Sequence, residues 1–513
     1  MEEGRTKRTA RNLVWGVAFR VLNMALPFLI RTIVIYTLGT LYLGLDGLFT
    51  SVLEVLNLTE LGIASAIVYS MYEPLAKGET AKVCALLNFY RRCYRIIGLV
   101  VAIAGLLLLP FLPHLITGKV PTDINIYVLY LMHLTGTVLS YELFAYRTSL
   151  LNATQRNDVV SKVNSVCYLC RCALQIVALL ICHSYYLYVI VNIFNAVANN
   201  IAAAAISRKM FPQYHCTGEI APDVVQDIWQ KVKGMVCQKI GNVVLMSVDT
   251  LVISSFLGLH SLALYQNYYV IFLGVATLFG VIQTAMMAPV GNAIAMDSVA
   301  KNYEDFKKFN FLYLFLGTWA SICLLCLYQP FVSVWLGPEL MLPDYLAALL
   351  ALCFFTFRWC DMSMIYQYAK GLWWETRWVP LLAGIINLTI NLVLVQFIGL
   401  AGIVISTIVS ILLVYDTGVI YAVFNSYFHS IDSIWHYWRR QILYLPVVFV
   451  VAFIIWQLAV LMPWTGMSLL LARLLLCILL TPILLWGFWW RREECRLARA
   501  FLSPMLKKSL RKD

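Results

Sequence analysis

The sequence is divided into apolar segments of about twenty residues, separated by short polar loops or by Gly and Pro. A helix rises about 1.5 Å per residue, so about twenty apolar residues cross the ~30 Å hydrocarbon core of a bilayer. The composition agrees, because 61% of the 513 residues are hydrophobic and only 12% are charged. Soluble proteins have an apolar share near half and a charged share near a quarter. The chain is therefore predicted to be an all-α polytopic membrane protein.

Fourteen such segments are predicted, six before a polar stretch at residues 207–233 and eight after it. They lie at about 13–38, 48–72, 95–116, 125–146, 162–182, 186–206, 234–256, 262–287, 309–331, 344–368, 378–398, 401–424, 441–462 and 468–490. Residues 1–12 lack the short apolar core and the small-residue cleavage site of a secretory signal. We expect them to form a cytoplasmic tail.

The distribution of basic residues tests this topology, because cytoplasmic loops of membrane proteins are enriched in Lys and Arg. Every second predicted loop is basic, whereas the loops on the opposite side hold only Lys119. The basic loop residues on the starting side are Lys77, Lys82, Arg91, Arg92, Arg147, Arg156, Arg208, Lys209, Lys231, Lys233, Lys301, Lys307, Lys308, Lys370, Arg377, Arg439 and Arg440, followed by those of residues 491–512. Both termini are thus predicted to be cytoplasmic. The net charge of +12 is attributed to topology rather than to nucleic-acid binding.

An internal repeat organises the first twelve predicted spans. The motif YLGLDGL, residues 42–48, joins the first two spans, and FLGLHSL, residues 256–262, joins the seventh and eighth. Both motifs are interpreted as short Gly hairpins, and since six spans separate them the halves are parallel repeats. The prediction is two six-helix lobes around a central cavity, with two further helices. The N-lobe is 1–206, a cytoplasmic linker is 207–233, the C-lobe is 234–424, and 425–513 holds two extra spans and a basic tail.

Eleven charged residues fall inside the predicted spans. Facing lipid, each would cost roughly 2.5 to 3.5 kcal/mol, and together about 30 kcal/mol. They are Arg20, Arg31, Glu54, Glu60, Glu142, Arg171, Asp249, Arg358, Asp361, Asp416 and Arg473. Most of them are therefore expected to face protein or water.

The first span carries a polar stripe on one face. Arg20, Asn23, Pro27 and Arg31 are spaced three, four and four residues apart, which places them on one side of a helix. The stripe runs from the cytoplasmic end towards the middle of the membrane. It indicates one wall of a hydrated cavity.

Carboxylates follow on neighbouring spans. Glu54, Asn57 and Glu60 occupy an arc of about 120° on the second span. In the second lobe, Asn242 and Asp249 lie seven residues apart and so share a face. Aligned on the Gly hairpin, Asp249 falls one turn from the position of the mid-span arginine of the first lobe.

Structural roles are the alternative at several of these positions. Arg358 and Asp361, three residues apart, could neutralise each other. Arg20 lies near enough to the cytoplasmic end to snorkel. Arg31 and Asp249 have no oppositely charged residue within four positions on their own helix, so a functional role is preferred for them over a buried structural pair.

The chemistry of these groups favours a transporter. Arginine binds phosphate through two charge-assisted hydrogen bonds and does not lose its proton, while carboxylates suit coupling ions. Walker, HExxH and GxSxG motifs are missing, and the fourteen cysteines form no disulfide framework or metal-ligand spacing. No enzymatic activity and no metal site are predicted.

Two stretches resemble a known family. Residues 42–83, YLGLDGLFTSVLEVLNLTELGIASAIVYSMYEPLAKGETAKV, and the following NFYRRCYRIIG are similar to the polysaccharide-transporter branch of the multidrug/oligosaccharidyl-lipid/polysaccharide flippase superfamily. Residues 238–271, QKIGNVVLMSVDTLVISSFLGLHSLALYQNYYVI, resemble the seventh and eighth spans of that family. The resemblance covers most of residues 8–424.

The resemblance implies a flippase of the bacterial cytoplasmic membrane. It would move undecaprenyl-pyrophosphate-linked oligosaccharide repeat units by alternating access, for the assembly of surface polysaccharide such as O-antigen. The predicted substrate-binding cations are Arg31, Arg20, Arg171 and Arg358, and the predicted gating or ion-coupling residues are Asp249, Glu60 and Glu54. The resemblance places Arg31 and Asp249 in the cavity, whereas Arg171 and Arg358 are inferred from burial alone. Sodium or a proton is the expected coupling ion, and membrane lipids, a glycan polymerase and glycosyltransferases are candidate partners.

Three other functions remain open at this point. An ion-coupled drug or metabolite exporter of the same superfamily is the main alternative, and efflux of organic cations would favour it. A membrane-embedded glycan polymerase or transferase would need catalytic residues in a long external loop, which the sequence does not supply. A purely structural or lipid-scrambling protein is excluded if transport is directional and depends on energy.

Overall fold

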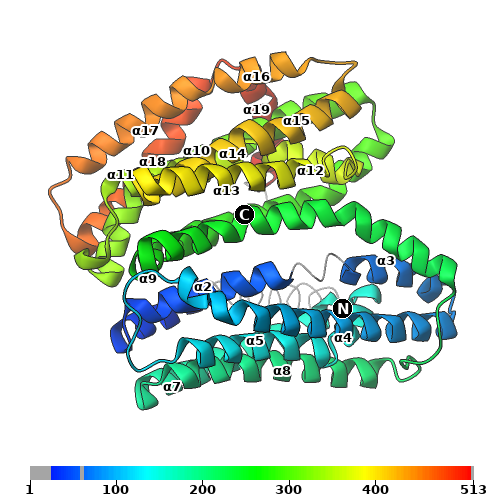
Figure 1. The fold of residues 1–513 in the computed structure, drawn as a ribbon. Helices are drawn as coiled ribbons and strands as arrows, with labels where there is room; N and C mark the ends of the chain where they lie inside the picture. Colours follow the sequence, from blue (N-terminus) through cyan, green and yellow to red (C-terminus); the bar gives the residue numbers. More distant parts are fainter. Residues whose placement is uncertain (1–24, 58–62, 510–513) are drawn as a thin grey trace, which may run out of the picture. The chain divides into compact units, whose positions relative to one another are not determined.

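The computed structural model describes residues 25–57 and 63–509 (Figure 1). In this part of the chain every regular element is a helix. The chain forms two compact units, Met1–Ala263 and Leu264–Asp513. The predicted lobe boundaries at 206/207 and 233/234 differ from this division, and the assignment of lobes stays a prediction.

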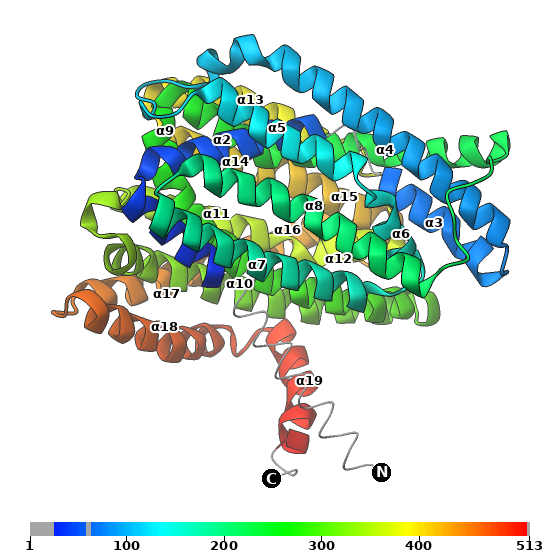
Figure 2. The ribbon, with the colours of Figure 1, turned by 90° about the horizontal axis from the view of Figure 1, so that it is seen from below.

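Within the described residues, the first element of the first unit is the helix Ala25–Thr37. It continues with α2 (Thr40–Leu56), α3 (Ile63–Ala76), α4 (Thr80–Leu108), the 3₁₀ turn η2 (Leu109–Leu115), α5 (Ile126–Glu142), α6 (Ala145–Ala153), α7 (Asn157–Cys182) and α8 (Tyr185–Met210). Helix α8 packs on α7 and α5, and α4 packs on α5, so these long helices lie side by side (Figure 2). The N-cap Asn125 starts α5 by accepting hydrogen bonds from the backbone N–H groups of Tyr127 and Val128.

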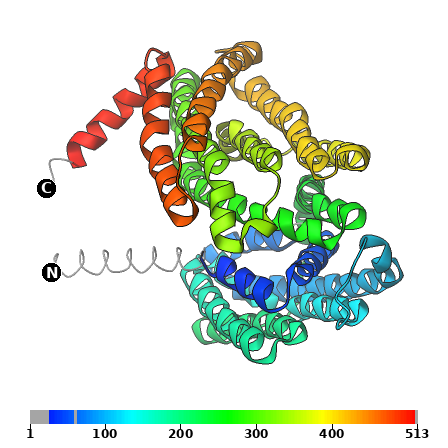
Figure 3. The same ribbon diagram turned by 90° about the vertical axis from the view of Figure 1, so that its left-hand side faces the viewer.

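Helix α9 (Pro222–Met296) carries the chain from the first unit into the second. The second unit continues with α10 (Val299–Leu336), η3 (Pro338–Leu340), α11 (Asp344–Trp359), α12 (Asp361–Lys370), α13 (Val379–Ile398), α14 (Leu400–Ser410), η4 (Ile411–Asp416), α15 (Thr417–Val423), η5 (Phe424–Phe428), α16 (Ile434–Ile442), α17 (Leu445–Val460), α18 (Gly466–Trp489) and α19 (Glu493–Ser509). Both η4 and η5 are π-helical turns. Helix α10 packs on α11, α17, α18 and α19. Figure 3 shows many helices of this unit nearly end-on, whereas α19, in red, is seen lengthwise.

Many of these helices are long and apolar enough to cross a membrane. Among the described residues there are ten, or eleven if α5 and α6, bent by 49°, form one span. The chain is therefore a multi-pass membrane protein. Two predicted spans, 234–256 and 262–287, correspond to one helical stretch at Val236–Met296. Of the predicted span 13–38, only the part from residue 25 onward belongs to the described residues. The exact number of fourteen stays a prediction.

The turn between the first two spans lies at Gly39, so the prediction of a hairpin at residues 42–48 is wrong. Gly39 has φ 104° and ends the first helix, and α2 starts at the next residue. Positive φ favours glycine, which has no Cβ to clash. Gly44 is instead inside α2, where a Cβ would lie 2.4 Å from the Leu259 carbonyl oxygen. The glycine there permits close approach of α2 and α9.

This correction changes the register of the internal repeat by five residues. Gly258, which interrupts α9 with φ 83° and ψ 173°, corresponds to Gly39, with φ 104° and ψ 171°. Arg31 lies eight residues before the first break, and Thr250 lies eight residues before the second. Arg31 in the first half therefore corresponds to Thr250 in the second, which is the residue next to Asp249.

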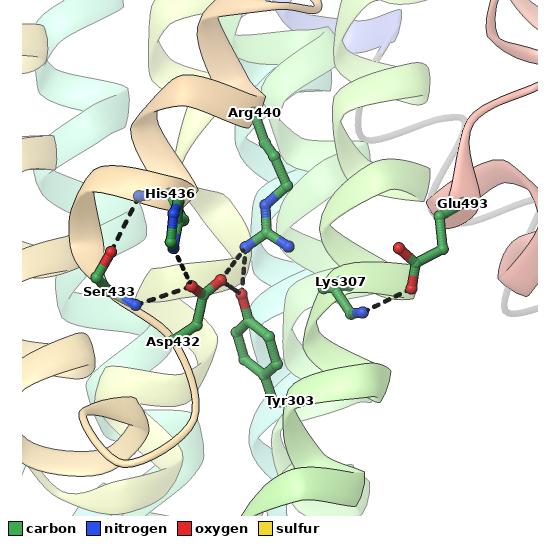
Figure 4. A network of polar contacts seen from close by, with 7 residues as sticks. All are labelled: Tyr303, Lys307, Asp432, Ser433, His436, Arg440 and Glu493. Atoms are coloured by element: carbon green, nitrogen blue, oxygen red, sulfur yellow. Dashed lines mark hydrogen bonds and ion pairs between the residues drawn. The ribbon is translucent and has the colours of Figure 1, made fainter.

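A polar network ties α16 to α10 within the second unit (Figure 4). The Asp432 carboxylate accepts hydrogen bonds from Arg440 Nη2 at 2.8 Å, from the Ser433 backbone N–H at 2.8 Å and from the Tyr303 hydroxyl, and it lies 3.0 Å from His436 Nδ1. Burial opposes the charged form of Asp432. The hydrogen bond from Tyr303, the charge of Arg440 and the bonds from Ser433 and His436 outweigh that effect, so the pKa of Asp432 is lowered from its ordinary value.

The C-terminal segment is attached through a neighbouring ion pair. Lys307 Nζ of α10 donates to Glu493 Oε1 of α19 at 2.8 Å, and this bond lowers the pKa of Glu493. The sequence predicts a basic tail at this position and does not predict that it continues as a helix packed on α10.

Candidate functional site

Arg31 lies in the middle of the helix Ala25–Thr37. The residue is half-buried, and its Nη2 donates to the Ala263 carbonyl oxygen of α9 at 3.2 Å. A carbonyl is a dipole and does not cancel the positive charge. Stabilisation of the Arg31 charge therefore depends on the other groups around it.

Asp46 of α2 is a carboxylate in this region. It is an electrostatic neighbour of Arg31, and its Oδ1 accepts a hydrogen bond from the Tyr185 hydroxyl at 3.2 Å. His133 Nε2 of α5 lies 4.0 Å from the same oxygen. Helices α2, α5 and α8 thus each place one polar side chain at a single point inside the first unit.

Tyr188 connects this point to a second arginine. Its ring stacks on that of Tyr185, with the two centroids 5.4 Å apart. The Tyr185 ring also contacts that of Tyr42, at 5.2 Å between centroids and a tilted angle. Tyr188 has both Arg31 and Arg171 as electrostatic neighbours. The Arg171 guanidinium of α7 lies over the ring of Tyr168, one turn earlier on the same helix, at 4.6 Å from the ring centroid.

We name this group the Arg31 cluster; its members are Arg31, Asp46, His133, Arg171, Tyr185 and Tyr188. These six residues include two guanidinium groups and one carboxylate, and Tyr188 is an electrostatic neighbour of both arginines. In surroundings of low polarity a guanidinium charge attracts anions strongly, because little water screens it. Phosphate oxygens match the planar fork of an arginine.

The predicted carboxylates are placed as follows. Glu54 of α2 accepts a hydrogen bond from Ser247 Oγ of α9 at 2.9 Å, so the second span and α9 meet at this residue. Asp249, two residues further on α9, is buried, with 7% of its surface exposed. Arg20 and Glu60 lie outside the described residues.

Arg358 belongs to the second unit rather than to the Arg31 cluster. Its Nη1 donates to Asp361 Oδ2 at 2.8 Å. Its guanidinium also lies over the rings of Phe279 and Phe354, 5.4 and 5.6 Å from their centroids. Mutual neutralisation of Arg358 and Asp361, the alternative raised by their spacing, is the arrangement observed.

Sequence reasoning missed four members of the cluster: Asp46, His133, Tyr185 and Tyr188. Asp46 lies in the motif that was interpreted as a hairpin, which hid its place in a helix. The other three occur in apolar segments without a recognisable spacing. The one sequence feature that could have indicated Asp46 is its position fifteen residues after Arg31.

Comparison with known proteins gives both a family and a fold. The family profile described as "Polysaccharide biosynthesis protein" matches residues 9–291. A comparison with curated protein sequences gives no match.

Several solved structures are similar in fold. The lipid II flippase MurJ, in an inward closed conformation, aligns with a TM-score of 0.67 at 15% identity over 93% of this chain and 99% of its own. An inward-facing multidrug resistance MATE family transporter of the MOP superfamily aligns with a TM-score of 0.64 at 13% identity, over 80% of this chain and 96% of its own. A mutant of the Vibrio cholerae MATE transporter VcmN aligns with a TM-score of 0.57 at 13% identity, over 80% of this chain and 94% of its own.

The alignments to structures establish the fold, because they extend over most of the chain at low identity. The profile match extends over more than half of the sequence and includes the whole of the Arg31 cluster. The chain therefore belongs to the polysaccharide biosynthesis protein family and has the fold of MOP superfamily transporters.

Proposed function

We propose that this protein is a flippase that moves an undecaprenyl-pyrophosphate-linked oligosaccharide across the bacterial cytoplasmic membrane. The observation that carries the proposal is the pair of guanidinium groups, Arg31 and Arg171, that the Arg31 cluster holds inside a multi-pass membrane protein. The family match and the likeness in fold to the lipid II flippase MurJ support it. Both termini would lie in the cytoplasm, as the basic loops predict.

Recognition of the cargo would use its pyrophosphate head. Arg31 and Arg171 present guanidinium groups that can each bind two phosphate oxygens. Asp46 serves as the counter-ion of Arg31 while the site is empty, and the pyrophosphate replaces it on binding. The polyprenyl tail stays in lipid, so the site needs to bind only the polar head and the first sugars.

Release on the other side would follow from alternating access. Once the site faces the opposite aqueous phase, Asp46 and Tyr185 compete with the pyrophosphate for Arg31 and promote release. Asp249, Glu54 and Glu60 are assigned to gating or to the coupling of an ion. Glycosyltransferases and a glycan polymerase would supply and consume the cargo, so they are candidate partners.

Complementation of a bacterial strain that lacks its repeat-unit flippase tests this function. Arg31→Ala removes a charge-assisted contact and should reduce export of surface glycan by about ten- to hundred-fold. Arg31→Lys should retain part of the activity, since it keeps the charge but not the fork. Arg156→Ala, at an exposed ion pair with Asp158, is the matched control and should export normally. Full export by Arg31→Ala at a normal membrane level would rule out this role.

A drug or metabolite exporter is the second candidate. It is favoured by the likeness in fold to MATE transporters. Efflux of organic cations from membrane vesicles, unaffected by Arg31→Ala, would support the exporter and count against the flippase.

A further inference from the structure

A cavity of about 780 Å³ lies within the second unit, among α10, α11, α17 and α18. Helix α10 packs on the other three (Figure 1). The lining includes Gln329, Asp344, Phe449, Phe453, Trp456 and Arg473. The loops at this end, 337–343 and 461–465, contain no Lys or Arg, so the predicted topology places the cavity near the external surface of the membrane.

Arg473 is held in the wall of the cavity by two backbone carbonyls. Its Nε donates to the Ala459 oxygen of α17 at 3.0 Å, and its Nη1 donates to the Cys326 oxygen of α10 at 3.3 Å. Each carbonyl lies four residues before a proline, Pro463 or Pro330, which has no N–H to continue the helical hydrogen-bond pattern. The guanidinium therefore satisfies two carbonyls that the helices themselves leave free.

The charge of Arg473 is not cancelled by these two dipoles. Asp344, the first residue of α11, lines the same cavity, and its Oδ1 accepts a hydrogen bond from Gln329 Nε2 at 2.7 Å. Within the described residues no ion pair joins Asp344 to Arg473, and no other carboxylate is paired with the guanidinium. One cation and one anion are thus held apart in a single cavity. Such charges are costly near lipid unless a partner binds them.

The opposite part of the lining is an aromatic face of α17. Phe449, Phe453 and Trp456 are spaced four and three residues apart, so they lie on one side of the helix. Their exposed fractions are 57%, 59% and 42%. The helix is part of a membrane-spanning candidate, Ile434–Val460, so this exposed apolar face lies against lipid. An occupant that matches the cavity has apolar chains next to a polar head.

We propose that the cavity binds one phospholipid with a primary ammonium group, of the phosphatidylethanolamine class, from the external leaflet. The phosphate accepts hydrogen bonds from Arg473, the ammonium donates to Asp344, and the acyl chains lie along the aromatic face of α17. The bound lipid fills the space between the last two spanning helices and the rest of the second unit, and so stabilises their packing. The site does not depend on the cargo proposed above.

The two separated charges determine which lipid fits. Phosphatidylglycerol has a phosphate but no cation, so it would leave the Asp344 carboxylate without a partner. Phosphatidylcholine has both charges, but its quaternary ammonium has no N–H to donate. A polyprenyl pyrophosphate adds negative charge beside Asp344, which disfavours it in the same way.

Native mass spectrometry of the full-length protein in detergent tests the site, with the three phospholipids added in equal amounts. Wild type should retain phosphatidylethanolamine about ten-fold more strongly than the other two, and Arg473→Gln should weaken its binding by about ten- to hundred-fold. Asp344→Asn should remove most of the preference over phosphatidylcholine. Lys119→Gln, which removes an exposed basic residue of another predicted external loop, is the matched control and should bind as wild type does.

A second variant separates lipid binding from folding, because Arg473→Gln also frees two backbone carbonyls. Ala348→Phe leaves Arg473 in place and fills the cavity, so it should abolish retention of the lipid. Phosphatidylethanolamine should raise the unfolding temperature of wild type but not that of Ala348→Phe.

Four results would overturn the proposal. They are equal retention of the three phospholipids by wild type, unchanged retention by Arg473→Gln, wild-type retention by Ala348→Phe, and the absence of any rise in the unfolding temperature of wild type. Preferential retention of undecaprenyl pyrophosphate from a mixture with phosphatidylethanolamine would also overturn it, because that result would indicate a second cargo site.

Discussion

At the residue scale, the main question is how a mid-span arginine is tolerated. Arg31 is half-buried beside Asp46 and Tyr188, and it donates to a backbone carbonyl of α9. These contacts offset part of the cost of placing a charge in the membrane. A guanidinium whose contacts include a backbone carbonyl and a neighbouring carboxylate is suited to an anion that has to bind and then leave.

The Arg31 cluster predicts the effect of removing its carboxylate. Asp46→Asn deletes the counter-ion, so the affinity of the purified protein for inorganic pyrophosphate should rise by about ten-fold. Isothermal titration calorimetry measures this affinity. Asp158→Asn, which changes an exposed carboxylate, should leave it unchanged. Equal or weaker binding by Asp46→Asn would contradict the assignment of Asp46 as the competing ion.

A second prediction at this scale concerns stability and pH. The pKa of Asp432 is lowered in the folded protein, so its contribution to stability is present above the unfolded pKa of about 3.9 and is lost as the pH falls through the folded value. Asp432→Asn should therefore lower the free energy of unfolding at pH 7 by about 1 to 3 kcal/mol. The difference from wild type should shrink in acid. Chemical unfolding in detergent at several pH values measures it, and a difference that grows in acid would be the wrong sign.

The sequence predicts some of these residues and not others, for a physical reason. A charge in an apolar segment is visible without a structure, so Arg31, Arg171 and Asp249 could be selected. The residues that contact these charges depend on how helices that are distant in sequence pack together. Asp46, His133 and Tyr188 therefore became visible only with α2, α5 and α8 in place.

At the element scale, apolar length predicts helices well but fixes their ends poorly. The windows at 162–182 and 186–206 correspond to α7 and α8 within a few residues. The sequence predicts the turn at residues 42–48, whereas it lies at Gly39. Gly39 and Gly44 are close in sequence, and only the backbone geometry shows that Gly39 forms a turn and Gly44 a close helix contact. The helix α19 was missed because a basic segment has no apolar periodicity long enough to predict it.

The close contacts at glycine predict which substitutions the helices tolerate. An alanine Cβ would lie 2.4 Å from the Leu259 carbonyl oxygen at Gly44 and 2.6 Å from the Leu394 carbonyl carbon at Gly402. Gly44→Ala and Gly402→Ala should each destabilise the protein by about 1 to 3 kcal/mol. Gly487→Ala, where nothing lies within 4 Å, should be neutral or stabilising. Thermal unfolding in detergent compares the three, and equal stability of all three variants would refute the packing described.

At the scale of the whole molecule, composition and charge were enough to predict a multi-pass membrane protein, and the resemblance of two stretches of sequence indicated the family. Long apolar segments leave the bilayer as the only suitable solvent, and the family profile and fold comparisons agree with that assignment. The substrate and the coupling ion are less predictable. They depend on a few polar contacts that contribute little to hydropathy.

The alternation of basic loops predicts the orientation of the molecule. A reporter that fluoresces only in the cytoplasm should be bright when fused after Asp513 and dark when inserted after Lys119, the one basic residue of the predicted external loops. Insertion after Lys77, in a predicted cytoplasmic loop, should be bright and serves as the internal control. A bright signal at Lys119 with a dark C-terminus would reverse the topology.

The most direct measurement is transbilayer movement of an undecaprenyl-pyrophosphate-linked oligosaccharide in liposomes that contain the purified protein. Wild type should move this lipid from one leaflet to the other, and Arg31→Ala should reduce the rate by about ten- to hundred-fold while Arg156→Ala does not. Movement at the rate of protein-free liposomes in wild type, or undiminished movement in Arg31→Ala, would contradict the account.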